Sequence, residues 1–204
     1  MFDAFILAGG KSSRMGRDKA SIEFDGISLL ERASAVLREA GAAGVSVVFS
    51  GRSELQVPDS IALIHDEFVD GGALAGIHAA LNASVSGTAF IAACDLPFAS
   101  AELARKLIEA LEKGEADCAI PEQPDGQLQP LFAAYRRDAA LGAAEHILRE
   151  PGASKAVGNF TDRLEPKILR FEEYSRLAHA RRLLKNVNTP EELESALFEN
   201  GPRI

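Results

Sequence analysis

A glycine-rich loop with four basic residues is the segment of this chain best suited to chemistry. It reads Leu7-Ala8-Gly9-Gly10-Lys11-Ser12-Ser13-Arg14-Met15-Gly16-Arg17-Asp18-Lys19 and follows a short apolar run. Glycines let backbone N–H groups approach phosphate oxygens, while Arg14 and Lys19 offer a planar fork and a point charge for the same oxygens. The loop is basic in a chain whose net charge is −8. This reversal favours an anion-binding loop over a merely solvated basic segment.

Two common phosphate-binding motifs do not fit this loop. A Walker A motif ending in Gly10-Lys11-Ser12 needs a glycine at position 5, which is Phe5. The dinucleotide fingerprint starting at Gly9 needs glycines at positions 11 and 14, which are Lys11 and Arg14. The loop therefore belongs to another class of phosphate-binding segment.

The elements that must position this loop alternate between short apolar runs and helical stretches. Residues 2–8, 45–49, 61–64 and 88–93 read as buried strands, and residues 28–40, 74–83 and 100–113 as helices. Ser28 and Glu31 stand in capping-box register, and Gly41 is a stop signal. Less regular strands are expected at 118–120, 131–136 and 167–171, with helices at 138–149 and from Thr189. The alternation predicts the α/β class, with a predominantly parallel twisted sheet and helices on both faces.

Composition narrows the class of protein. With 204 residues, 47% hydrophobic and 25% charged, the chain should form one domain over 1–204 with a sizeable core. The longest apolar run, residues 89–94, is far short of the ~18 residues of a membrane span. The net charge of −8 argues against nucleic acid and anionic membranes as partners. The N-terminal residues lack a secretory signal pattern, so we expect a cytoplasmic protein.

Cysteines and histidines suggest no metal or redox site. Cys94 and Cys118 are far apart and outside any C-x-x-C pattern, so both are expected to be buried thiols. The four histidines show no spacing typical of a metal site or a triad, and we interpret all of them as structural: His65, His78, His146 and His179.

Three other segments could complete a site at the carboxyl ends of the strands, where ligands of open α/β sheets bind. Asp95 follows a buried strand and could hold Mg²⁺ on a triphosphate, or it could cap the next helix. Glycines 71, 72 and 76 bracket Leu74, which suggests backbone lying against a flat base, although turn chemistry alone could explain them. Asn186 and Asn188 alternate along an extended stretch and therefore face the same way, unless they cap the helix that follows.

The first loop resembles the signature L-A-G-G-x-S-x-R-M-G-x-D-K of pyrophosphorylase-type nucleotidyltransferases, and all ten specified positions match. Within that superfamily the chain looks most like the molybdenum cofactor guanylyltransferases, because further segments match in order over nearly the whole chain. These are Asp66, Gly72-Ala73-Leu74-Ala75-Gly76, Cys94-Asp95-Leu96-Pro97, Gln129-Pro130-Leu131-Phe132 and Asn186-Val187-Asn188-Thr189-Pro190-Glu191-Glu192-Leu193.

The resemblance implies a three-layer Rossmann-like nucleotidyltransferase fold with a nucleotide-binding N-terminal half and an acceptor-binding C-terminal half. It implies a GTP site formed by Leu7, Ala8, Gly9, Gly10, Lys19, Asp66, Leu74, Gly76 and Asp95. It further implies catalytic roles for Arg14, Lys19 and Asp95, Mg²⁺ at Asp95, and molybdopterin contacts at Asn186 and Asn188. Asp66 could accept from guanine or ribose, or be a solvated loop acid. Relatives often carry paired basic residues where Ser154-Lys155 stands here, so Arg149 or Lys155 is a candidate replacement.

The activity that the resemblance implies is transfer of GMP from GTP to the terminal phosphate of molybdopterin, with release of pyrophosphate. GTP and the molybdenum cofactor are the expected partners, together with other cofactor-biosynthesis proteins that the sequence does not name. Two alternatives stay open: a related transferase acting with CTP or on a sugar phosphate, and a nucleotide-binding module without catalysis.

Overall fold

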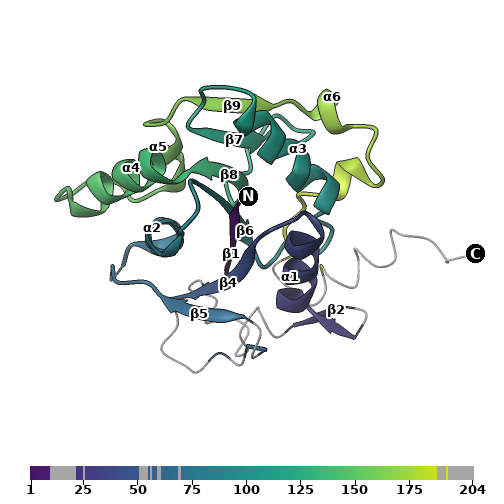
Figure 1. Ribbon diagram of the computed structural model, residues 1–204, viewed down its shortest axis with the longest axis horizontal. Helices are drawn as coiled ribbons and strands as arrows, with labels where there is room; N and C mark the ends of the chain where they lie inside the picture. The colour runs from purple at the N-terminus through teal and green to yellow at the C-terminus, as the bar shows by residue number, and fades with distance from the viewer. Residues whose placement is uncertain are drawn as a thin grey trace, which may run out of the picture.

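A seven-stranded sheet forms the centre of the molecule (Figure 1). The computed structural model describes residues 1–9, 22–24, 26–50, 55, 57–58, 61–68, 70–187 and 192. The strand order is β5-β4-β1-β6-β8-β7-β9. The strands are β1 (Asp3–Leu7), β4 (Gly44–Phe49), β5 (Ala62–His65), β6 (Thr88–Ala93), β7 (Cys118–Pro121), β8 (Phe132–Arg136) and β9 (Pro166–Leu169).

Strand directions confirm a predominantly parallel sheet with one reversed strand. β5, β4, β1 and β6 run parallel, with Ile6 opposite both Val47 and Ala92, and β7 and β9 are parallel to each other. β8 is antiparallel to both of its neighbours, β6 and β7. The reversal follows from the connection between β7 and β8, which contains no crossover helix and so returns the chain in the opposite direction.

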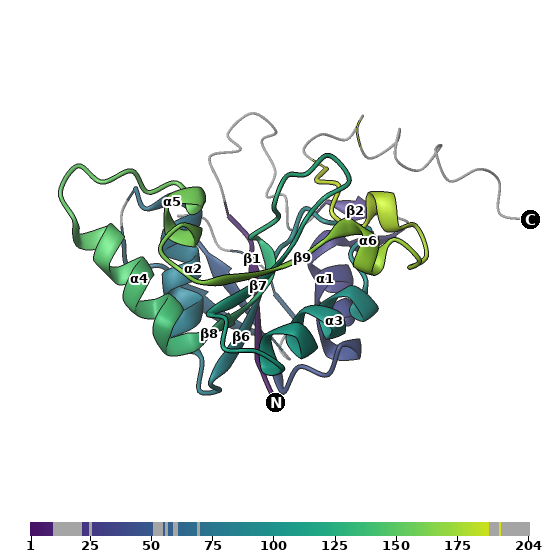
Figure 2. The same ribbon diagram turned by 90° about the horizontal axis from the view of Figure 1, so that it is seen from above.

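Helices cover both faces of the sheet, which confirms the three layers (Figure 2). One face carries α1 (Leu29–Glu39), α3 (Ala101–Glu112) and α6 (Phe171–Tyr174), and the other carries α2 (Gly72–Ala83), α4 (Arg137–Arg149) and α5 (Val157–Thr161). Alternate strand residues divide between the two cores: Ile6 packs in the first, whereas Phe5 and Leu7 pack in the second. The 3₁₀ helix η2 (Ala180–Arg182) adds Ala180 to the first core, and β2 (Glu23–Phe24) and β3 (Ile27–Ser28) form a separate antiparallel pair.

The expected helix signals act as predicted in α1. Ser28 Oγ accepts from the Glu31 N–H at 3.2 Å, and the Glu31 carboxylate accepts from the Ser28 N–H at 3.1 Å. Gly41 follows the helix with φ of +100°, a conformation that glycine adopts without strain. The expected end of the last strand is wrong, because β9 ends at Leu169 and Phe171 begins α6. Other expected bounds differ by one or two residues, as at α2, which begins at Gly72 instead of Leu74.

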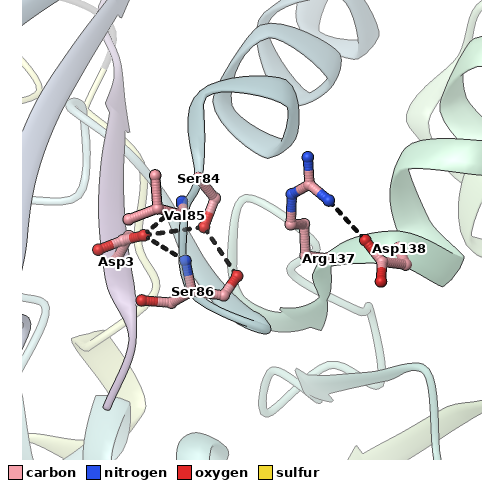
Figure 3. A network of polar contacts seen from close by, with 6 residues as sticks. All are labelled: Asp3, Ser84, Val85, Ser86, Arg137 and Asp138. Carbon is pink, nitrogen blue, oxygen red and sulfur yellow. Dashed lines mark hydrogen bonds and ion pairs between the residues drawn. The ribbon is translucent and has the colours of Figure 1, made fainter.

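The amino edge of the sheet is held by the carboxylate of Asp3 (Figure 3). Its Oδ2 accepts hydrogen bonds from the Ser84 hydroxyl and from the N–H groups of Val85 and Ser86, at 2.9–3.0 Å. These donors outweigh the effect of burial and leave the pKa of Asp3 below its ordinary value. The carboxylate therefore ties the start of β1 to the turn between α2 and β6, at the edge opposite the predicted site.

Both cysteines are buried, as expected. His78 is also buried and lies edge-on to Phe68, with ring centroids 4.9 Å apart, so its role is structural. None of the helices in the described part of the chain is long and apolar enough to cross a membrane.

Candidate active site

The carboxyl ends of β5, β4, β1 and β6 lie at one edge of the sheet, here called the carboxyl edge. At this edge the chain leaves β1 through Leu7, Ala8 and Gly9. The Ala8 N–H donates to Val48 O at 2.9 Å, and Leu7 O accepts from the Cys94 N–H at 3.2 Å. These bonds tie Leu7 and Ala8, with which the glycine-rich segment begins, to both neighbouring strands.

Gly9 is required by close packing against the end of β4. A Cβ atom at this position would lie 2.3 Å from Ser50 Oγ and 3.0 Å from the Ser50 backbone nitrogen. The hydroxyl could rotate away, but the backbone nitrogen could not move without shifting the segment after β4. Glycine therefore allows the first loop to pass against the neighbouring strand at this point.

Four predicted site residues lie outside the described residues. Gly10, Arg14 and Lys19 belong to the stretch 10–21, and Asn188 to the stretch 188–191. Their assignments remain predictions from the sequence, as does the helix expected from Thr189.

Asp95 lies at the carboxyl edge, two residues beyond the end of β6, and is partly buried. The alternative that it caps the next helix is wrong, because Ser100 is the N-cap of α3 and accepts from the Leu103 N–H at 3.2 Å. Its carboxylate Oδ1 accepts from Asn186 Nδ2 at 3.3 Å, and its backbone oxygen accepts from the Val187 N–H at 2.9 Å. The structure thus brings together one residue predicted for nucleotide and metal and one predicted for the acceptor.

Gln129 joins the same site, although sequence reasoning assigned it no role. Its Nε2 donates to Asn186 Oδ1 at 3.0 Å, and the residue is only 8% exposed. Because β8 is antiparallel to β6, the residues before β8 lie at the carboxyl edge, beside the end of β6. The sequence signal was present in the segment Gln129-Pro130-Leu131-Phe132, but without the strand direction nothing placed that segment beside Asp95.

Asp66 follows β5 at the far side of the same edge and is partly buried. Burial raises its pKa, and the neighbouring His65 opposes the shift. β5 and β6 are separated by β4 and β1, which at about 4.8 Å per strand spacing puts their ends about 14 Å apart. That separation suits an extended ligand lying across the strand ends better than one ion held by both carboxylates.

Leu74 and Gly76 lie in α2, over the face of the sheet. The Leu74 side chain is fully buried in the second core, so it offers a ligand at most its backbone. A Cβ atom on Gly76 would point at Leu7, 3.4 Å from its Cδ2 atom. Gly76 therefore brings α2 close to β1, and contact of this segment with a base stays a prediction.

The carboxyl edge has donors suited to a hard cation but not a complete protein cage. Within the part of the chain that the structure describes, no three His, Cys, Asp or Glu side chains form a metal-binding group. Mg²⁺ commonly takes one or two carboxylates and completes its shell with phosphate oxygens and water. Asp95 fits that pattern, because it supplies a carboxylate at the strand end where the nucleotide is predicted.

The two basic candidates for the acceptor differ in their surroundings. Arg149 is in the last turn of α4 and donates from Nε and Nη2 to Glu145 Oε1, at 3.0 and 2.7 Å. Lys155 is partly buried in the segment between α4 and α5. Arg149 would have to leave an existing ion pair to bind a phosphate, and this favours Lys155.

The chain is similar in sequence to known proteins of one family. The family model of the MobA-like NTP transferase domain matches residues 4–165. A probable molybdenum cofactor guanylyltransferase of Pelotomaculum thermopropionicum is 35% identical over 192 residues, which cover 94% of this chain and 89% of the relative. The molybdenum cofactor guanylyltransferase of Xanthomonas euvesicatoria pv. vesicatoria is 34% identical, with 96% and 94% covered.

Solved structures show the same fold. The crystal structure of molybdopterin-guanine dinucleotide biosynthesis protein A from Archaeoglobus fulgidus has a TM-score of 0.75 and 26% identity, and 96% of each chain is covered. A 4-diphosphocytidyl-2C-methyl-D-erythritol synthase from Anaerococcus prevotii, at 15% identity and a TM-score of 0.69, shares the fold alone. The extent of the family match, together with relatives above 30% identity over nearly the whole chain, shows that this protein belongs to the MobA-like NTP transferase family.

Proposed function

We propose that this protein transfers GMP from GTP to the terminal phosphate of molybdopterin and releases pyrophosphate. The observation that carries the proposal is the hydrogen bond between Asn186 and Asp95. It joins an amide predicted to meet the acceptor to a carboxylate predicted to serve the nucleotide. The names of the relatives, which include molybdenum cofactor guanylyltransferase, support the same reaction.

The reaction needs alignment and charge neutralisation more than proton transfer. A phosphate monoester has a second pKa of about 6, so the acceptor is largely a dianion at pH 7 and needs no strong general base. One of its oxygens attacks the α-phosphorus of GTP, and the bond from that phosphorus to the β-phosphate oxygen breaks. Pyrophosphate leaves with the electron pair of that bond, in line with the attack.

Residues of the carboxyl edge divide this work between them. Leu7, Ala8 and Gly9 lead the chain into the loop whose Arg14 and Lys19 would neutralise the phosphates. Asp95 would hold Mg²⁺, which would supply positive charge to the triphosphate. Asn186 donates to Asp95. From that position it would hold the acceptor near the reacting phosphorus.

Asp95→Ala tests the proposal at the carboxylate. We expect pyrophosphate release from GTP and molybdopterin to fall at least about a hundredfold, because an anionic metal ligand is lost. Glu112→Ala is the matched control, since it also removes one carboxylate but lies exposed at the last residue of α3. Near-normal turnover in a folded Asp95→Ala protein would contradict the proposed mechanism.

A further inference from the structure

Gln129 is held in place from both sides by the backbone of the sheet. The backbone N–H of Gln129 donates to Pro121 O at the end of β7, at 3.0 Å, and its backbone oxygen accepts from the Phe132 N–H at the start of β8, at 3.1 Å. The side chain is buried as well, with the whole residue 8% exposed. A buried amide with a fixed backbone has little freedom to choose another partner, so its contact with Asn186 is a built feature of the site.

The side-chain amide of Asn186 accepts from Gln129 through its oxygen and donates to Asp95 through its NH2 group. Gln129 Nε2 donates to Asn186 Oδ1 at 3.0 Å, while Asn186 Nδ2 donates to Asp95 Oδ1 at 3.3 Å. The neighbouring Val187 is buried, and its N–H donates to the Asp95 backbone oxygen at 2.9 Å. Asn186 itself is exposed, so it remains within reach of a ligand.

The direction of these bonds determines which end of the Asn186 amide faces the carboxylate. An asparagine amide can turn by 180° and exchange its oxygen with its NH2 group. A donor at Gln129 favours the orientation in which the oxygen faces Gln129. The NH2 group then faces Asp95, where the reversed orientation would set two oxygens against each other.

From this geometry we infer that Gln129 is a positioning residue that sets the orientation of the Asn186 amide and, through it, the placement of the Asp95 carboxylate. The inference rests on the proposed function for its effect on the reaction. Gln129 does not contact the reacting atoms itself. It connects the part of the sheet around β7 and β8 to the carboxyl end of β6, so that the acceptor side and the nucleotide side of the site keep one relative position.

A double-mutant cycle tests whether Gln129 acts through Asn186. Gln129→Met keeps the length of the side chain but removes the donor, and we expect kcat/KM for molybdopterin to fall about tenfold. If the effect passes through Asn186, adding Gln129→Met to Asn186→Ala causes no further loss. Multiplying effects in the double variant would overturn the inference. Gln127→Met is the control, because this glutamine is exposed in the same loop.

Gln129→Glu is a second variant of the same shape. A carboxylate only accepts, so in either orientation of the Asn186 amide its oxygen must face a carboxylate, at position 129 or at Asp95. We expect a larger loss than in Gln129→Met, with the KM for GTP changing less than kcat/KM for the acceptor. A change in the fraction of folded protein alone would lower kcat without altering either KM.

The orientation of the amide can also be observed without catalysis. In ¹⁵N-labelled protein without ligands, the side-chain NH2 signals of Asn186 are identified by their loss in Asn186→Ala. We expect these signals to move in Gln129→Met while most backbone signals stay in place, and unchanged signals would overturn the inference. A wild-type protein that released no pyrophosphate would refute the proposed function, and these spectra would still decide the role of Gln129.

Discussion

Replacing Gly9 with alanine tests whether close packing at the end of β1 shapes the nucleotide site. The added Cβ would lie 2.3 Å from Ser50 Oγ and 3.0 Å from Ser50 N, so the segment after β4 must shift even if the hydroxyl rotates. Overpacking of this kind costs about 1–3 kcal/mol. Alanine recovers up to about 1 kcal/mol by restricting the unfolded chain. We therefore expect a net loss of about 1–2 kcal/mol in the free energy of unfolding.

Gly76→Ala is the matched control, because it makes the same substitution at a second glycine predicted to bind GTP. Its Cβ would contact Leu7 Cδ2 at 3.4 Å, an ordinary packing distance, and would point toward the sheet. Within a helix, alanine is favoured over glycine by about 0.5–1 kcal/mol. Gly76→Ala should therefore be as stable as the wild-type protein or more stable.

Urea unfolding followed by circular dichroism measures the stability of both variants, and calorimetric titration with GTP measures their binding. For a domain of this size the loss in Gly9→Ala corresponds to a fall in Tm of roughly 2–8 °C. We also expect weaker GTP binding, because Gly9 belongs to the predicted GTP site and the added Cβ atom forces Gly9 and Ser50 apart. The reasoning is refuted if Gly9→Ala matches the wild-type protein in both measurements, or if Gly76→Ala is the less stable of the two.

Three further predictions concern groups away from the site. The pKa of Asp3 is lowered in the folded protein, so the stabilisation that it gives is present above the unfolded value of 3.8 and is lost as the pH falls through the lower folded value. Asp3→Asn should cost about 1–2 kcal/mol in urea unfolding at pH 7, and this difference should shrink as the pH falls below 3.8. Burial raises the pKa of Cys118 to about 12, so a disulfide reagent such as DTNB should modify it only after unfolding, and rapid modification of the native thiol would contradict this. Arg136 donates to the carbonyl oxygens of Leu111, Gly114 and Ala116 at 2.6–3.1 Å, so Arg136→Met should cost about 2–4 kcal/mol in the same unfolding assay. Arg137→Met is the control, because it removes only the partly exposed ion pair with Asp138 (Figure 3) and should cost less than about 1 kcal/mol.

Local patterns predicted most of the N-terminal half of the fold. The strands β1, β4 and β6 coincide with runs of mostly buried apolar residues, and the expected bounds of β6 are those observed. The strand expected at 61–64 is present as β5, but it lies at the edge of the sheet and is partly exposed, not buried. Ser28 and Glu31, which hydrogen-bond to each other at a spacing of three residues, correctly marked the start of α1. Such signals can be read because they depend on residues only a few positions apart.

The C-terminal half depended on contacts that sequence spacing does not show. The position of β8 between β6 and β7 is set by pairing between distant segments, and the wrong end of β9 arose because Phe171, an apolar residue, begins a helix. The Glu173 carboxylate accepts from the Arg170 N–H at 2.8 Å and so helps to end the strand there. The same dependence on strand direction hid Gln129 from the predicted site, whereas Asp95 could be located because it lies only two residues after the end of β6.

Pyrophosphate release is the most direct test of the central claim that this protein is a guanylyltransferase acting on molybdopterin. The assay compares GTP, CTP and ATP in the presence of Mg²⁺, each with and without molybdenum-loaded molybdopterin. We predict release with GTP only when the pterin is present. Preferred release with CTP would contradict the assignment of the nucleotide, and silence with all three, from protein shown to be folded, would contradict the proposed reaction itself.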